Sequence, residues 1–322
     1  MLTIDPDLFR PDAISPETQA MNDKIEAFLK DKPTIMELGP VLVRELRAKG
    51  EGLLGKQPAS ELARWETAKA LGLEVPVRVF RPEGDLVGVY LHIHGGGHTI
   101  GGADFQDQIL EDYARRLSCA VVSVEYRLAP ENPWPAPADD CEAAAVWLFE
   151  TAGEMFGTEK IAVGGESAGG HLAAVTVLRM RDNHQKSFVG ANLVYGVFDL
   201  SGTPALKNWG ERNLVLNTPI VYWFAEQLLP KAQFEKADKT DPQYSPLYAR
   251  LEGLCPALFS VGTADPIIDD TLFMAQRWVA AGNEAELEIY PGGIHAFDQI
   301  PGLTIAEEHH GAARAFLKSC FR

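Results

Sequence analysis

The chain contains 322 residues, of which 46% are hydrophobic and 23% are charged, a composition that excludes intrinsic disorder as the main state. Its 45 acidic and 29 basic residues give a net charge of −16. Because a phosphate backbone repels an acidic protein, nucleic acids and anionic membrane surfaces are not expected as partners.

The amino-terminal residues 1–19 carry acids and prolines where a secretory signal would carry basic residues and then an apolar run. No apolar stretch approaches the roughly 18 residues that a membrane span requires. We therefore expect a cytoplasmic protein without a membrane partner. The four cysteines show no CxxC spacing, which predicts buried or inert thiols and neither a zinc site nor a disulfide framework. They are Cys119, Cys141, Cys255 and Cys320.

Two amphipathic helical patterns occupy residues 17–49, separated by Pro33, and from about residue 75 short apolar runs take their place. We predict strands at residues 75–80, 87–93, 120–124, 161–164, 191–195, 257–261 and 285–290. We predict helices between them at residues 105–117, 137–151, 168–181, 270–281 and 304–318. Buried strands that alternate with helices indicate an α/β fold with a mostly parallel central sheet flanked by helices.

The alternation breaks between about residues 198 and 242. This stretch predicts a helix at 218–229 but no strand, and it is rich in large aromatic residues. These are Trp209, Tyr222, Trp223, Phe224 and Phe234. We expect an insertion that packs over the carboxyl edge of the sheet and joins the amino-terminal helices as a lid.

A GxSxG motif, Gly165-Glu166-Ser167-Ala168-Gly169, follows one predicted strand and opens a predicted helix. That is the context of a nucleophile elbow, a tight strand-to-helix turn that exposes a serine hydroxyl between small residues. The motif alone is weak evidence, because short patterns of this kind also arise by chance. Its position between strand and helix makes Ser167 a candidate nucleophile.

A glycine run, His94-Gly95-Gly96-Gly97, ends another predicted strand. In a parallel sheet this places the run at the same carboxyl edge as Ser167. Consecutive glycines allow the backbone to approach a ligand closely, and an HGGG loop is a known partner of the elbow in an oxyanion hole. Without the elbow, the run would indicate only a flexible turn.

A serine hydroxyl needs a base to take its proton and an acid to orient that base. In α/β hydrolases the chain order is serine, acid, histidine. Asp265 and His295 each follow a predicted strand in that order. Asp269 and Asp270 compete with Asp265, but they lie at the start of a predicted helix, where carboxylates complement the helix dipole.

We expect the remaining histidines to pack in the interior or to lie at the surface. Three follow an HxHxxxH pattern, which does not define a tetrahedral site in the absence of an acidic ligand, so we expect no metal. They are His92, His94 and His98. His171, just after the elbow, is expected to contribute to helix packing. His309 and His310 are expected to face solvent on the last helix.

Taken together, these motifs resemble the hormone-sensitive-lipase-like family of α/β hydrolases, the bacterial family IV esterases. The resemblance runs from about residue 75 to the carboxyl terminus. Its markers are HGGG at 94–97, EYRLAPENPWPAPADD at 125–140, GESAGG at 165–170, ADPIIDD at 264–270 and GGIHAF at 292–297.

The resemblance implies a catalytic domain at residues 51–322 and a helical cap formed by residues 1–50 and the insertion at 198–242. It implies catalytic roles for three side chains, with Ser167 as nucleophile, His295 as general base and Asp265 as its orienter. It assigns the oxyanion hole to the backbone N–H groups of Gly96, Gly97 and Ala168. Supporting roles fall to His94, Gly95, Glu166, Tyr126 and Glu131.

The sequence departs from the family pattern beside the motifs. Glu166 stands where aspartate is more common, His98 stands where an aromatic residue is common, and GGADFQD at 101–107 replaces a stretch that usually bears serine and histidine. These differences leave the three catalytic positions intact and affect the expected substrate preference, because His98 and Phe105 are expected near the pocket mouth.

The expected function is hydrolysis of short-chain acyl esters through an acyl-enzyme, without a metal or other cofactor. The alternatives are an amidase, arylformamidase or deacetylase with the same three residues, and a ligand-binding relative that has lost catalysis. The last predicted strand, ELEIY at 286–290, is a plausible sheet edge, so it predicts a homodimer paired along that strand.

Overall fold

An eight-stranded sheet organises the molecule in a computed structural model that describes residues 2–51, 55 and 58–322. Its spatial order is β1-β2-β4-β3-β5-β6-β7-β8. The strands are β1 (Ala63–Ala70), β2 (Leu73–Phe80), β3 (Val89–Ile93), β4 (Ala120–Val124), β5 (Ile161–Glu166), β6 (Gly190–Val194), β7 (Ala257–Ala264) and β8 (Ala285–Ile294). All neighbours from β4 to β8 are parallel, whereas β2 is antiparallel to β1 and β4.

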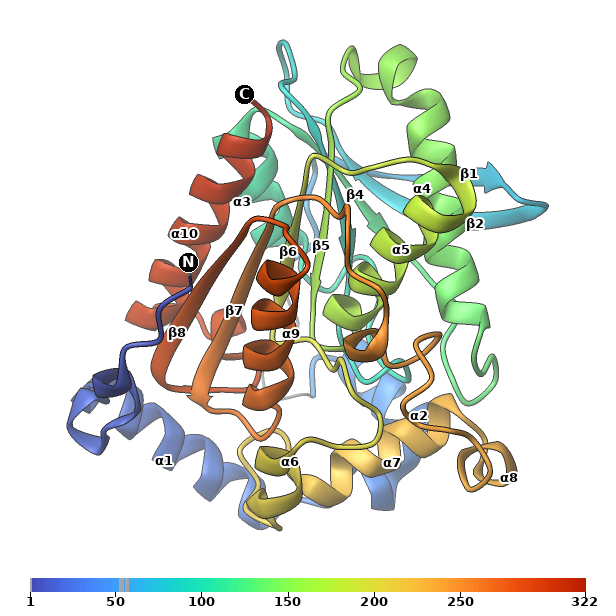
Figure 1. The fold of residues 1–322 in the computed structure, drawn as a ribbon. Coiled ribbons are helices and arrows are strands. Elements are labelled where there is room, and N and C mark those ends of the chain that lie inside the picture. The colour runs from blue at the N-terminus through green and yellow to red at the C-terminus, as the bar shows by residue number, and fades with distance from the viewer. Residues whose placement is uncertain (1, 52–54, 56–57) are drawn as a thin grey trace.

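Helices cover both faces of this sheet, as strands that are buried on both sides require (Figure 1). Helices α4, α5 and α9 pack on one face, and α3 and α10 pack together on the other. Their bounds are α3 (Asp107–Leu117), α4 (Ala136–Phe156), α5 (Ala168–His184), α9 (Ile268–Ala280) and α10 (Thr304–Cys320). The predicted α/β fold with a mostly parallel sheet is confirmed.

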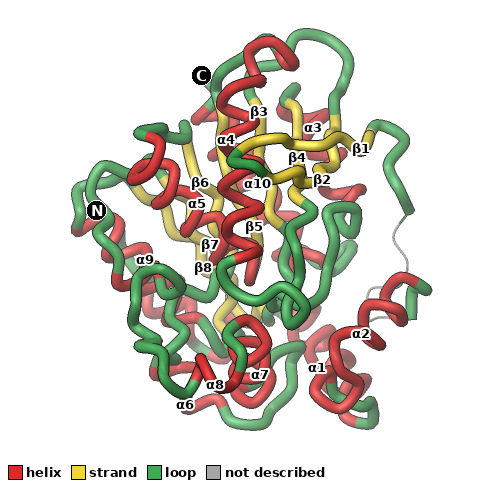
Figure 2. Tube along the Cα trace, turned by 90° about the vertical axis from the view of Figure 1, so that its right-hand side faces the viewer, coloured by secondary structure: helices red, strands yellow, loops and turns green. Residues whose placement is uncertain are grey.

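A second group of helices lies at the carboxyl ends of the strands, at the bottom of Figure 1 and again in the turned view of Figure 2. We call this group the cap. It consists of α1 (Pro16–Lys30), α2 (Ile35–Ala48), α6 (Pro204–Trp209), α7 (Thr218–Leu228) and α8 (Lys231–Phe234). Short 3₁₀ turns complete the structure at Pro6–Phe9, Pro11–Ala13, Pro246–Tyr248 and Phe297–Gln299.

The two amino-terminal helices begin at capping residues that the sequence supplies. The Ser15 hydroxyl accepts from the Thr18 N–H, and Thr34 and Glu37 form a reciprocal capping box at the start of α2. Inside α2, Gly39 has φ 73° and ψ 160°, which breaks the helical path just before Pro40. The apolar residues of α2 therefore fall on two short segments that meet at an angle.

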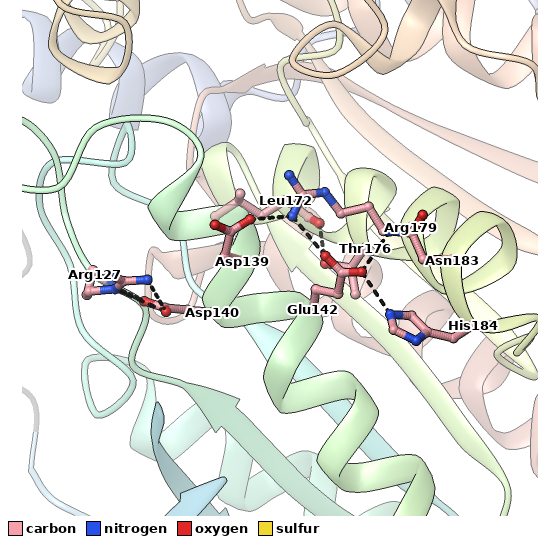
Figure 3. A network of polar contacts seen from close by, with 9 residues as sticks. All are labelled: Arg127, Asp139, Asp140, Glu142, Leu172, Thr176, Arg179, Asn183 and His184. Carbon is pink, nitrogen blue, oxygen red and sulfur yellow. Dashed lines mark hydrogen bonds and ion pairs between the residues drawn. The ribbon is translucent and has the colours of Figure 1, made fainter. Parts of the chain in front are cut away.

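A polar network fastens α5, the helix that follows the elbow, to α4 (Figure 3). Arg179 of α5 pairs with Asp139 at 2.7 Å and with Glu142 at 3.0 Å, both on α4. Glu142 also accepts hydrogen bonds from the Asn183 amide and the His184 ring, each at 2.8 Å. Because Glu142 has three partners on α5, this network restrains the helix more than an isolated surface ion pair would.

The register of the strands places four predicted site segments in two neighbouring pairs. Ile93 is the Cα partner of Gly165, so the glycine run that follows β3 lies next to the elbow that follows β5. Ala264 is the partner of Ile294, so the residues that follow β7 and β8 are neighbours as well. The carboxyl edge of one sheet therefore collects every candidate catalytic residue before any side-chain contact is considered.

Candidate active site

Ser167 occupies the turn between β5 and α5 with φ 58° and ψ −120°. A serine in this region is strained, and such strain is typical of functional positions. The neighbouring glycines make the turn possible, because a Cβ on Gly165 or Gly169 would clash with the Ile93 carbonyl group of β3. The elbow is thus pressed against the strand that carries the glycine run.

His295 connects Ser167 to Asp265. Its Nε2 lies 2.8 Å from the Ser167 Oγ, and its Nδ1 lies 2.8 Å from Oδ2 of Asp265. A carboxylate accepts from Nδ1–H, which leaves Nε2 as the acceptor of the serine hydroxyl hydrogen. His295 and Asp265 are 4% and 1% exposed, so water competes little for either bond. The arrangement can activate Ser167 as a nucleophile.

The remaining carboxylate oxygen of Asp265 is also occupied. Oδ1 accepts the Ile267 N–H at 3.0 Å, which orients the carboxylate toward His295. The competing carboxylates face elsewhere. Asp269 accepts the Ala205 N–H at 2.7 Å, and Asp270 accepts the N–H groups of Phe198 and Asp199. Asp269 and Asp270 lie in the first turn of α9, as predicted, and both also bind backbone N–H groups at the entry to the cap insertion.

Burial raises the pKa of Asp270 to about 7 despite its hydrogen bonds from backbone N–H groups and the Thr203 hydroxyl. Between about pH 4 and pH 7 the unfolded chain ionises this carboxyl while the folded chain does not. We therefore expect the unfolding free energy of the wild type, relative to Asp270→Asn, to fall by about 1.4 kcal/mol per pH unit in that window and to level off above it. Urea unfolding at pH 5, 6 and 8 tests this, and a difference that rises with pH would contradict it.

The three residues that are expected to form the oxyanion hole lie in the turn after β3 and at the start of α5. Gly96 and Gly97 have φ 116° and 58° in the turn after β3, and Ala168 begins α5. Within the part of the chain that the structure describes, no hydrogen bond uses the N–H of any of the three. The run lies against the elbow, because a Cβ on Gly95 would sit 3.3 Å from the Ser167 Cβ.

Side chains beneath the glycine run hold its shape. Glu166 accepts the Gly95 N–H at 2.6 Å and the Gln106 side-chain amide at 2.5 Å, and His92 lies 3.0 Å from its other oxygen. The Tyr126 hydroxyl donates to the His94 carbonyl at 2.8 Å. The Tyr126 and His94 rings stack at 4.2 Å, and burial lowers the pKa of His94 to about 4.

Glu131 supports the same loop indirectly, through a residue that the sequence did not indicate. Arg44 of α2 pairs with both carboxylate oxygens of Glu131 at 2.9 Å and donates to the carbonyls of Thr99 and Ala129, each at 2.7 Å. A planar guanidinium is suited to such a multidentate contact. The cap is thereby joined to the loop that carries the candidate donors.

The contacts from Ser167 through His295 to Asp265 form a relay, and the burial of two histidines outside it differs from expectation. His309 and His310 are 1% and 8% exposed, so the prediction that they face solvent was wrong. They lie on the face of α10 that packs against the sheet, where His310 donates to the Asp298 carbonyl at 2.9 Å and accepts from the Tyr113 hydroxyl at 3.0 Å. Two adjacent polar residues on a helix indicated an exposed face, but the Tyr113 hydroxyl that contacts His310 comes from α3, 197 residues away.

The HxHxxxH residues do not converge. The His92 ring contacts Glu166 and Ser123, and the His94 ring contacts the Gly95 carbonyl. The His98 ring contacts His171. Across residues 2–51, 55 and 58–322, no three His, Cys, Asp or Glu side chains form a metal-binding group. In the same residues, no helix is both long and apolar enough to cross a membrane.

Tyr195 is a further residue at the site that sequence reasoning missed. Its ring packs 4.7 Å from the His295 imidazole, and its hydroxyl donates to the buried Asp298 carboxylate. Tyr195 directly follows β6. A polar aromatic residue at the end of a strand could therefore have identified it as a candidate site residue.

A model of the α/β hydrolase fold matches residues 90–299, most of the described sheet. The chain belongs to the hormone-sensitive-lipase-like family of α/β hydrolases. One relative of this hydrolase is the carboxylic ester hydrolase LipN of Mycobacterium tuberculosis, 35% identical over 70% of this chain. The match spans 61% of LipN, so it leaves over a third of that relative uncovered.

Other relatives of the hydrolase are covered more fully. An ethyl acetate hydrolase of Pseudomonas putida is 33% identical, with 74% of this chain and 76% of that protein matched. The solved structure of an esterase from the archaeon Pyrobaculum calidifontis is 30% identical and superposes with a TM-score of 0.84 over 95% of this chain and 98% of that chain. The similarity to this structure includes the cap as well as the sheet.

Proposed function

We propose that this α/β hydrolase is a serine carboxylesterase that acts on short-chain acyl esters. The observation that carries the proposal is the pair of 2.8 Å distances joining Ser167 to His295 and His295 to Asp265. Relatives named carboxylic ester hydrolase and ethyl acetate hydrolase support the bond type. Hydrolysis of p-nitrophenyl esters from acetate to palmitate tests it, and inactivity on every ester would refute it.

The mechanism follows from the relay. Nε2 of His295 takes the Ser167 hydroxyl proton as Oγ attacks the ester carbonyl carbon. The carbonyl oxygen becomes an oxyanion, which the N–H groups of Gly96, Gly97 and Ala168 stabilise. His295 then protonates the leaving alcohol as the ester C–O bond breaks. Water attacks the resulting acyl-enzyme with His295 as base, the bond between the acyl carbon and Ser167 Oγ breaks, and His295 returns the proton to Oγ as the acid leaves. Asp265 stabilises the imidazolium in both steps without itself taking the proton.

The cap supplies an apolar wall next to the candidate oxyanion hole. The ring of Phe224 on α7 lies directly over Gly97, in the space that a Cβ there would occupy. Phe224 belongs to an apolar cluster that joins both cap segments to the sheet edge. Its other members include Ile35, Met36, Val197, Leu206, Leu216, Ile220, Val221, Tyr222 and Ile267.

This wall predicts a limit on acyl length. We expect activity to fall steeply beyond about eight acyl carbons, because a confined pocket rejects longer chains by overpacking. Phe224→Ala should shift the optimum toward longer esters by removing the ring above Gly97. The matched control is Glu226→Ala, an exposed position on the same helix. Rapid wild-type hydrolysis of long-chain triglyceride emulsions would contradict the prediction.

Two other functions share this geometry. An amidase or deacetylase would use the same relay, since amide and ester carbonyls form the same oxyanion. Parallel assays with p-nitrophenyl acetate and an aryl acetamide separate the two bond types. A ligand-binding relative without catalysis is disfavoured, because the serine, histidine and aspartate are all in hydrogen-bond contact.

The edge strand β8 carries the proposed dimer interface. Among the residues that the structure describes, it pairs only with β7, which leaves the backbone of residues 286–290 as an edge. The end of the strand is covered by the chain itself, because the Asn22 amide of α1 donates to the Gly292 carbonyl at 2.8 Å. We expect light scattering to give a mass twice 35.2 kDa, and the monomer mass would contradict pairing along this edge.

A further inference from the structure

Two buried histidines outside the catalytic relay form a hydrogen bond beside the candidate oxyanion hole. His98 Nε2 lies 3.0 Å from His171 Nδ1, and the rings meet edge to face with centroids 5.0 Å apart. His98 is 4% exposed and His171 is 0% exposed. The bond is therefore shielded from competing water.

The partner of the second ring determines the direction of this bond. His171 Nε2 lies 3.0 Å from the Tyr244 carbonyl oxygen, which can only accept. Nε2 of a neutral His171 thus carries the hydrogen, and its Nδ1 is left as an acceptor. His98 consequently donates from Nε2–H, and the chain of donors runs from His98 through His171 to the Tyr244 carbonyl.

The surroundings keep both rings neutral. Burial lowers the pKa of His171 to about 4 and the pKa of His98 well below its ordinary value. The other charged or titratable groups that act on the pair are His94, near His98, and Arg179, near His171. The positive charge of Arg179 opposes protonation of His171, and burial outweighs the contacts with the Gly97 and Tyr244 backbone, which favour protonation.

The hydrogen bond joins the two parts of the candidate oxyanion hole. His98 follows Gly97 and has φ 60°, a left-handed conformation that is unfavourable for an L-residue and needs outside support. Its carbonyl accepts the Ala129 N–H at 2.9 Å. His171 lies one turn into α5, where its N–H donates to the Ser167 carbonyl at 3.0 Å.

We propose that His98 and His171 are positioning residues that hold the Gly96–Gly97 loop at a fixed distance from Ser167 and from the helix that begins at Ala168. The proposal rests on the proposed esterase function. Glu166 fastens one end of the glycine run through the Gly95 N–H, and the histidine pair fastens the other end. Oxyanion stabilisation depends on donors already in place, so a loop that drifts from α5 weakens the transition state more than the substrate complex.

The test compares two replacements of His98. Phenylalanine keeps a ring but has no donor, whereas glutamine places an amide N–H near the position of Nε2. We expect His98→Phe to lower kcat on the order of tenfold with KM within about twofold. It should weaken by a similar factor the binding of a trifluoromethyl ketone, which adds to Ser167 and forms an oxyanion. His98→Gln should recover most of both losses.

The control is Lys186→Phe, which places the same aromatic side chain at an exposed position beyond the end of α5 and outside the network around Glu142. It should leave kcat and inhibitor affinity within about twofold of the wild type. A rise in KM at unchanged kcat in His98→Phe would make His98 a substrate-contacting residue and overturn the proposal. Equal losses in His98→Phe and His98→Gln would overturn it too, because the hydrogen bond would then not be responsible.

An NMR measurement, which requires no turnover, tests the histidine hydrogen bond independently of the proposed esterase function. In wild-type protein labelled with ¹⁵N-histidine, NMR at pH 7 should show His98 and His171 as neutral Nε2–H tautomers. A charged ring, or a hydrogen on Nδ1 of His171, would overturn the pairing even if the His98 variants fail to fold. Absence of all ester hydrolysis in the wild type would instead refute the esterase function.

Discussion

Replacement of Ser167 by alanine should lower kcat for p-nitrophenyl acetate by about a millionfold, because nucleophile and base act as a unit. The residual rate would reflect only the backbone donors and substrate binding. The fold should be unaffected, since the only side-chain hydrogen bond of Ser167 among the described residues is the one to His295. Rates should be compared at equal concentrations of enzyme that melt at the same temperature.

The control for this experiment is Ser187→Ala, an exposed serine beyond the end of α5. It should keep the wild-type rate. If Ser167→Ala and the wild type hydrolyse the ester equally fast, the elbow is not the catalyst. If the wild type is inactive on esters and on the aryl acetamide, the ligand-binding alternative takes the place of the esterase.

Asp265→Asn should lower kcat by about ten-thousandfold while leaving the site nearly isosteric. The asparagine amide would present either a donor toward Nδ1 of His295 or a neutral acceptor in place of a carboxylate. In the first case the imidazole takes the wrong tautomer and Nε2 can no longer accept the serine proton. In the second, the imidazolium formed during attack loses its counter-charge. Steady-state kinetics across pH 6 to 9 measure the loss.

Asp269→Asn is the matched control, because it removes a carboxylate four residues along the chain that contacts only the Ala205 N–H among the described residues. Its kcat should stay within a few-fold of the wild type. A loss in Asp269→Asn as large as that in Asp265→Asn would show that the carboxylate cluster, and not one aspartate, supports His295. The pairing of Asp265 with His295 would then lose its assigned role.

The positions of the catalytic candidates were predictable because each follows an apolar strand. Ser167, Asp265 and His295 come after β5, β7 and β8, and parallel strands bring their carboxyl ends to one edge. β1 escaped prediction for the opposite reason. Only Ala63 and Ala68 of its eight residues are buried, so this edge strand has no apolar alternation to detect.

Contacts between residues far apart in the sequence could not be predicted from local sequence patterns. Arg44 and Glu131 are 87 residues apart, and Asp270 and the Phe198 N–H are 72 residues apart. A lone arginine on an amphipathic helix normally predicts a solvated side chain, and acids in a first helical turn predict a dipole effect. The partners of Arg44 and Asp270 come close only because the cap packs over the sheet.

The cap insertion leaves the sheet after β6 and returns before β7, two strands that are already hydrogen-bonded neighbours. A loop between such fixed ends costs only about 0.6 kcal/mol more for each doubling of its length. None of Ser167, Asp265 and His295 lies within it. Changes in the length or sequence of this insertion can therefore alter the walls of the proposed pocket while Ser167, Asp265 and His295 keep their geometry, so that substrate selectivity and catalytic chemistry can change separately.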